Sequence, residues 1–97
     1  MTRSRILHAL VSSEDPEHAL QGAKELARCA DAKLGPCQRL GPAPAPLARL
    51  RGRHRVQMLV KGPADAVREI ARALQETARK LPEGVHAHLD AHPIHML

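Results

Sequence analysis

The sequence predicts an α+β domain in which two helices cover one face of a four-stranded antiparallel sheet. Four short segments are apolar or alternate between apolar and polar residues, and two longer segments repeat apolar residues at helical spacing. Their order along the chain is β-α-β-β-α-β, which is typical of a ferredoxin-like fold. Right-handed crossovers would place the first and third strands in the centre of the sheet. A length of 97 residues suits one domain, so we expect residues 1–97 to fold as a single unit without repeats.

The first two elements are a short strand and an amphipathic helix. Residues 5–11 are mostly apolar, and residues 12–15 end this strand and supply an N-cap. Pro16 suits the first helical turn, and the helix is expected to continue to about Lys33, before Leu34-Gly35-Pro36. Its apolar stripe consists of Ala19, Leu20, Ala23, Leu26, Ala27 and Ala30.

A second, weaker strand is predicted to begin at residues 37–40. Prolines at positions 42, 44 and 46 each lack an amide donor, so a regular central strand cannot continue through them. We therefore expect an extended segment of polyproline character or a sheet edge, irregular from about Gly41 to Gly52.

Residues 53–61 alternate well and predict a half-buried strand with a basic face. One side of this strand carries His54, Val56, Met58 and Val60. The other side carries Arg53, Arg55, Gln57 and Lys61, and we expect it to point away from the helices.

The second helix is predicted to begin at Gly62-Pro63 and the last strand to cover residues 85–91. The turn between them is residues 82–84. The apolar stripe of this helix consists of Val67, Ile70, Ala71, Leu74, Ala78 and Leu81.

Composition narrows the possible functions. The chain has no Phe, Tyr or Trp, so its core must rest on aliphatic residues and is expected to be thin. Many open sheets bind RNA by stacking its bases on exposed aromatic residues. The lack of Phe, Tyr and Trp argues against this mode of binding here. No secretory signal and no membrane-spanning segment is visible, which indicates a cytoplasmic protein without membrane contact.

Positive charge is concentrated in the middle of the sequence. Residues 32–64 contain seven basic residues and no acid, whereas the other 64 residues have a net charge of −2. A local patch of this kind attracts an anionic partner, and the alternative is a solvated arginine-rich loop. The basic residues are Lys33, Arg39, Arg49, Arg51, Arg53, Arg55 and Lys61.

Catalytic and metal motifs are weak. There is no phosphate-binding loop of the form G-x-x-x-x-G-K-[ST], so no ATPase site and no enzymatic activity is expected. Cys29 and Cys37 match no zinc spacing and are expected to be reduced thiols. The last strand carries His86, His88, Asp90 and His92 at period two, and we interpret this as a solvated polar face rather than a metal site.

Three segments resemble the C-terminal domain of primosomal protein N′ (PriA), a helicase family of bacterial replication restart. They are L-G-P-A-P-A-P at residues 40–46, R-G-R-H-R-V-Q-M-L-V-K at 51–61 and L-D-A-H-P at 89–93. The similarity extends from Arg5 to Leu97. It implies a ferredoxin-like domain that packs beside helicase lobes; the zinc and ATP sites of the family lie in other domains, so no cofactor is expected in this chain.

The resemblance also implies binding partners. The family domain contributes to binding of branched or single-stranded DNA, for which Arg49, Arg51, Arg55 and Lys61 are the candidates here. It also helps to bind the acidic C-terminal tail of the single-stranded DNA-binding protein, and the two matching positions are Arg53 and Gln57. The sequence departs from the family at His54 and Val56, where aromatics are usual, and at His92, where a second acid is usual.

The sequence therefore predicts a non-catalytic domain of a replication-restart protein that binds DNA and the acidic tail. One alternative is a ferredoxin-like RNA- or ribosome-associated module that uses the same basic segment. A second is a small regulatory or metal-binding domain centred on the last strand.

Overall fold

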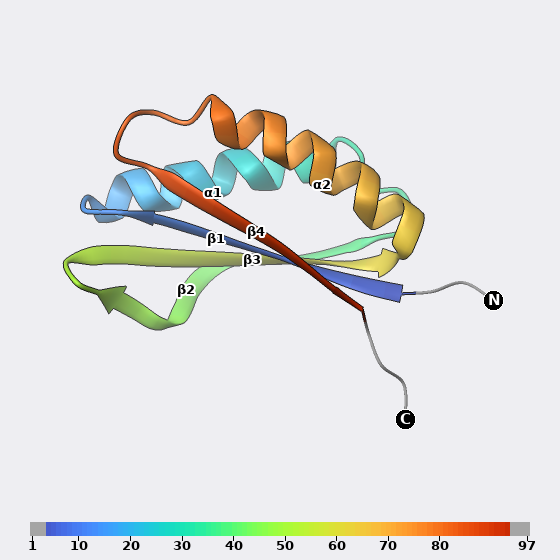
Figure 1. The fold of residues 1–97 in the computed structure, drawn as a ribbon, viewed down its shortest axis with the longest axis horizontal. Helices are drawn as coiled ribbons and strands as arrows, with labels where there is room; N and C mark the ends of the chain where they lie inside the picture. The colour runs from blue at the N-terminus through green and yellow to red at the C-terminus, as the bar shows by residue number, and fades with distance from the viewer. Residues whose placement is uncertain (1–3, 94–97) are drawn as a thin grey trace.

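A computed structural model describes residues 4–93, and its elements follow the predicted order (Figure 1). The α+β ferredoxin-like fold is confirmed. The elements are β1 (Ser4–Ser13), α1 (Pro16–Asp31), β2 (Gln38–Leu50), β3 (Arg53–Pro63), α2 (Ala64–Arg79) and β4 (His86–Pro93).

The four strands form one sheet in the order β2-β3-β1-β4, and all neighbours are antiparallel. The first and third strands are central, as the crossover argument predicts. Both helices lie on the same face of the sheet, and residues 4–93 place no helix over the opposite face (Figure 1). In this way the fold creates one covered and one open face.

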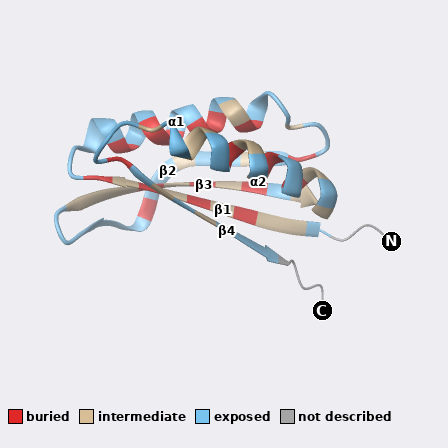
Figure 2. Ribbon diagram, turned by 45° about the horizontal axis from the view of Figure 1, so that its top comes forward, coloured by how far each residue is buried: buried red, intermediate tan, exposed pale blue. Residues whose placement is uncertain are grey.

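The core fills the layer between the helices and the covered face of the sheet (Figure 2). It contains small and aliphatic side chains, since the chain has no large aromatic residues to contribute. The largest fully buried side chains are Leu7, Val11, Leu26, Met58, Val60, Val67, Ile70 and Leu74.

Helix α1 begins where the sequence predicts. The carboxylate of Asp15 accepts hydrogen bonds from the amides of Glu17 at 2.8 Å and His18 at 3.3 Å, so the N-cap is occupied. Leu20, however, is 39% exposed and does not belong to the core stripe, which is narrower than predicted. Helix α2 begins at Ala64, with Pro63 as its N-cap residue.

Two alternatives were predicted for residues 41–50, and the sheet edge is the correct one. These residues continue β2 along the edge of the sheet and do not form a loop that is irregular up to Gly52. An edge strand tolerates proline because half of its amides point away from the neighbouring strand. The pairing is nevertheless interrupted: residues 45–48 oppose the single residue Arg55 of β3, which is a large bulge.

Candidate binding face of the sheet

The face of the sheet opposite the helices is the surface on which most predicted site residues lie, and we call it the open face. In β1, residues Leu7, Ala9 and Val11 are at most 1% exposed beneath the helices, so the residues between them point the other way. The strand pairing then assigns the open-face residues of the three strands on this side. They are Ile6, His8, Leu10 and Ser12 from β1, Arg53, Arg55, Gln57, Leu59 and Lys61 from β3, and His86, His88, Asp90 and His92 from β4.

Arg53 holds one end of the open face together. Its Nε donates to Ser12 Oγ at 3.2 Å, and its Nη2 donates to the carbonyl oxygens of Ser12 at 2.9 Å and Gly84 at 3.1 Å. The guanidinium therefore joins β3 to the end of β1 and to the turn before β4. Within residues 4–93, Nη1 of Arg53 has no hydrogen-bond partner, so part of the guanidinium can still meet a ligand.

Gln57 occupies the middle of the same face. Its Oε1 lies 3.0 Å from His8 Nε2, which links the two central strands. Its side-chain amide NH₂ remains a donor towards the open face. Four residues along a strand separate it from Arg53, or roughly 13 Å.

The candidate DNA-binding residues fall into two groups. Arg49 and Arg51 lie at the β2–β3 turn, where Arg51 has a φ of 53° and Gly52 a φ of 79°. Arg55 is next to them, half-buried, and donates through Nη1 to the Leu47 carbonyl at 3.0 Å. Lys61 lies eight residues from Arg53 at the far end of β3, roughly 26 Å away.

The basic residues of the acid-free segment are thus not one patch in space. Arg49, Arg51, Arg53 and Arg55 lie at or beside the β2–β3 turn, which we call the arginine end of the sheet. Arg49 pairs with His54 and therefore lies on the other face from Arg53 and Arg55. Among the described residues, none of these four forms a salt bridge. The arginine end is therefore the place where residues 32–64 contribute most positive charge that is not neutralised by a salt bridge.

Arg39 behaves differently because it has an acidic partner outside the segment. Its Nε and Nη2 meet the two carboxylate oxygens of Asp31 at 2.6 and 2.9 Å, and it also donates to the Gly41 carbonyl. The hydrogen bond from Arg39 lowers the pKa of Asp31, and the same bond raises the pKa of Arg39. This pair fastens the start of β2 to the end of α1 and removes one charge from the predicted patch.

The described residues give little support for a metal site or for a reactive thiol. His92 Nε2 lies 3.1 Å from Asp90 Oδ2, yet residues 4–93 contain no group of three or more His, Cys, Asp or Glu side chains able to hold an ion. Both cysteines are free thiols, as expected. Cys37 is buried, and this burial raises the pKa of its thiol, so it carries little of the reactive thiolate at neutral pH.

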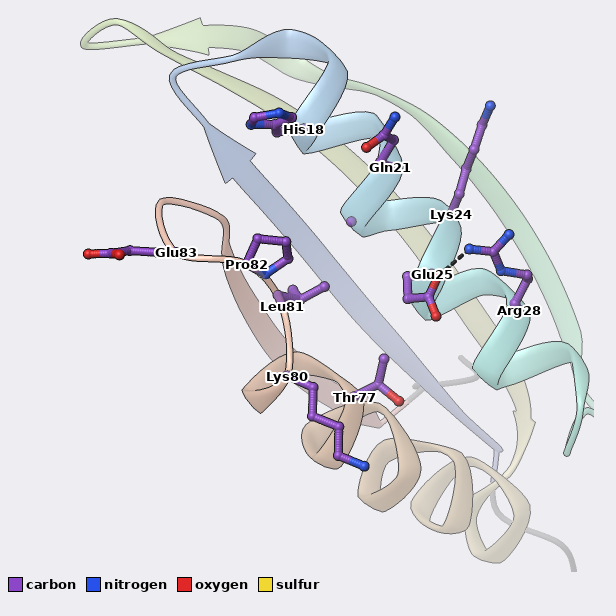
Figure 3. Close-up of a pocket in the computed structure, with 11 residues that line it drawn as sticks. His18, Gln21, Lys24, Glu25, Arg28, Thr77, Lys80, Leu81, Pro82 and Glu83 are labelled. Atoms are coloured by element: carbon purple, nitrogen blue, oxygen red, sulfur yellow. Dashed lines mark hydrogen bonds and ion pairs between the residues drawn. The ribbon is translucent and has the colours of Figure 1, made fainter.

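A groove of 810 Å³ runs between α1 and α2 on the opposite side of the molecule (Figure 3). No predicted site residue lines it. Its walls mix cations such as Lys24 and Lys80 with the acids Glu25 and Glu83, and Glu25 is paired with Arg28. Mixed charge gives this groove no clear preference for an anion, unlike the arginine end.

Across the described part of the chain, neither helix has the length and apolar character that crossing a bilayer requires.

Residues 4–93 thus form a ferredoxin-like domain that leaves one face of the sheet without a helix and carries four arginines at one end of the sheet. The sequence identifies the family of this domain. Residues 3–94 match the family described as the primosomal protein N C-terminal domain, and the chain belongs to this family. The resemblance recognised in the sequence is thereby confirmed. Among curated proteins, none matches the chain significantly.

Solved structures support the fold alone, since their sequences are distant. The designed protein Foldit4 has a TM-score of 0.70 at 6% identity, with 92% of this chain and 96% of that chain covered. A hydantoinase/carbamoylase family amidase from Burkholderia ambifaria has a TM-score of 0.56 at 18% identity, and the match covers 93% of this chain but 27% of the amidase. The designed ferredoxin-fold protein LFR1 1 has a TM-score of 0.51 at 10% identity, covering 97% and 87% of the two chains.

Proposed function

We propose that this chain is a non-catalytic binding domain of a replication-restart protein and that its arginine end binds DNA phosphates. The observation that carries the proposal is the gathering of Arg49, Arg51, Arg53 and Arg55 at one end of the sheet, without a described acidic partner. Guanidinium groups contact phosphate oxygens regardless of base sequence. Family membership supports DNA and replication proteins as partners. We also propose that the domain packs beside the helicase lobes of a longer protein in the cytoplasm.

Salt dependence tests this proposal. Three or four phosphate contacts to a single strand should give a log–log slope of binding against salt of about −2 to −3. The double variant Arg49→Ala/Arg51→Ala should flatten that slope by about 1 to 1.5. A matched control is Lys24→Ala/Lys80→Ala, which removes two positive charges from the helix groove. Equal slopes for the parent and the Arg49/Arg51 variant would reject the arginine end as the contact.

We further propose that Arg53 and Gln57 bind an acidic peptide tail, such as that of the single-stranded DNA-binding protein. Their position on one exposed face, roughly 13 Å apart, suits an extended peptide better than one small anion. Nε and Nη2 of Arg53 are engaged with Ser12 and Gly84, so Nη1 is the nitrogen that Arg53 can offer to a carboxylate. A lysine keeps the positive charge but cannot make these bonds and meet the carboxylate at the same time. Arg53→Lys should therefore lose less affinity for a labelled tail peptide than Arg53→Ala, but should still lose some.

The control for Gln57 comes from its contact with His8. Gln57→Ala and His8→Ala both break the same bond between the central strands, but only Gln57→Ala removes the amide that would meet the peptide. Anisotropy titrations that show equal affinity for the parent, Arg53→Ala and Gln57→Ala would exclude this role.

A further inference from the structure

The β1–β4 half of the open face carries four of the chain's seven histidines. His86, His88 and His92 lie on β4 and are exposed, and His8 lies on the neighbouring central strand. Although the chain has no Phe, Tyr or Trp, it therefore does present planar rings on its uncovered sheet. Imidazole rings stack on nucleic-acid bases, as the larger aromatic rings do.

The strand pairing places two of the three β4 rings beside an apolar residue of β1. His88 lies opposite Leu10 of β1, His92 opposite Ile6, and His86 opposite Ser12. Alternate residues of a strand are roughly 6.5–7 Å apart, so each ring is separately accessible instead of packing against the next. Leu10 and Ile6 are half-buried, so apolar surface is available beside the rings for the faces of bases.

Charge on the same face favours a polyanion. Across β1 from the histidines, β3 presents Arg55 and Lys61. Asp90 is the acid that the described strands place on this face, and it contacts His92 at 3.1 Å. A strand with bases over β4 could therefore meet cations along β3 with its phosphates. An acidic peptide would satisfy the cations but would leave the rings without a stacking partner.

We propose that His86, His88 and His92 form a base-stacking strip for single-stranded nucleic acid, with the β3 cations holding its phosphates. This inference rests on the proposed DNA binding and specifies its ligand, because bases in a duplex are not available for stacking on a protein surface. Single-strand platforms combine a basic track with planar side chains in the same manner.

The experiment compares a labelled oligothymidine with an abasic oligonucleotide of equal length and charge, using fluorescence anisotropy and the 97-residue chain. The parent should bind oligothymidine at least ~5-fold more tightly than the abasic strand, and more tightly than duplex DNA. His86→Ala/His88→Ala should weaken oligothymidine binding by ~5-fold or more and leave abasic binding nearly unchanged. His86→Phe/His88→Phe should retain or strengthen oligothymidine binding, since it replaces each imidazole with a larger aromatic ring that can stack but has no nitrogen. His18→Ala, at an exposed position of helix α1, is the control and should change neither affinity.

The outcomes separate this inference from the proposal on which it rests. Phosphate binding without stacking would appear as equal affinity for oligothymidine and the abasic strand, which would overturn the strip while leaving the arginine end in place. Loss of oligothymidine binding in both the alanine and the phenylalanine variants would also overturn it, because nitrogen contacts would then be responsible. Absence of binding to every oligonucleotide would overturn both proposals. Tighter binding of oligouridine than of oligothymidine would support the strip and identify RNA as its ligand.

Discussion

The two faces of the sheet carry different kinds of side chain, and strand β1 contributes residues to both faces. Leu7, Ala9 and Val11 face the helices and are at most 1% exposed, whereas the alternate residues His8 and Leu10 are half-buried on the open face. The covered face is filled by aliphatic side chains, and the open face carries imidazoles, guanidiniums and an amide. The difference indicates that the covered face stabilises the fold, which leaves the open face available for binding chemistry. Substitutions on the two faces should therefore have separable effects.

The largest effect on the free energy of unfolding is expected in a comparison of Leu7 with Leu10. These two residues are of the same type and lie on opposite faces of β1. Leu7→Ala should lower the free energy of unfolding by about 2–5 kcal/mol, since it leaves a cavity in a thin core. Leu10→Ala should cost less than about half as much, because its side chain already contacts solvent. Urea unfolding of both variants measures the difference. Equal losses would mean that the open face is as important to the core as the covered face.

A smaller effect on stability is expected in a comparison of Arg53 with Arg55, which both lie on the open face. Arg53→Ala removes three hydrogen bonds that connect β3 with Ser12 and Gly84, and should cost about 1–3 kcal/mol of unfolding free energy. Arg55→Ala removes one bond to Leu47 and should cost about 0.5–1 kcal/mol. Both variants remove one positive charge, so a stability loss that is the same for both would show that the contacts of Arg53 are unimportant. Any loss of peptide or DNA affinity in Arg53→Ala must be measured where the variant is fully folded.

The sequence predicted the architecture because its signals are local. Strand β3 alternates with period two, and that alternation alone assigned Arg53 and Gln57 to one face and Val56 and Met58 to the other. The element order then led to the ferredoxin-like arrangement with the correct central strands.

Features that depend on distant contacts were not predictable in the same way. Arg53 bonds to residues 41 and 31 positions away, so its structural role has no signature near position 53. Arg39 finds Asp31 across the helix-to-strand connection, just outside the acid-free segment that defined the patch. Residues 41–50 were predicted to be an irregular extended segment or a sheet edge because their prolines exclude a central strand, and the structure places them at the edge. Pro42 and Pro46 fall in two separate interruptions of the pairing, whereas Pro44 lies opposite Val56. The histidine strip had a visible signal in its period-two spacing, but its position beside the β3 cations required the strand order.

The smallest test concerns Asp31 and Arg39, at the margin where α1 meets the edge of the sheet. Because Arg39 lowers the pKa of Asp31 in the folded chain, the stabilisation is present above the unfolded pKa of about 4 and is lost as the pH falls through the folded value. Asp31→Asn should therefore be slightly less stable than the parent between about pH 5 and pH 8, and the difference should disappear in strong acid. Both groups contact solvent, so the shift of the urea midpoint should be small and should shrink further in high salt. Asp65→Asn is the control: that aspartate lies 3.6 Å from Arg68 within one exposed helical turn and connects no separate elements. If the two asparagine variants lose equal stability at neutral pH, the Asp31–Arg39 pair contributes no more than an ordinary surface contact, and β2 is held at the sheet edge by its pairing with β3 alone.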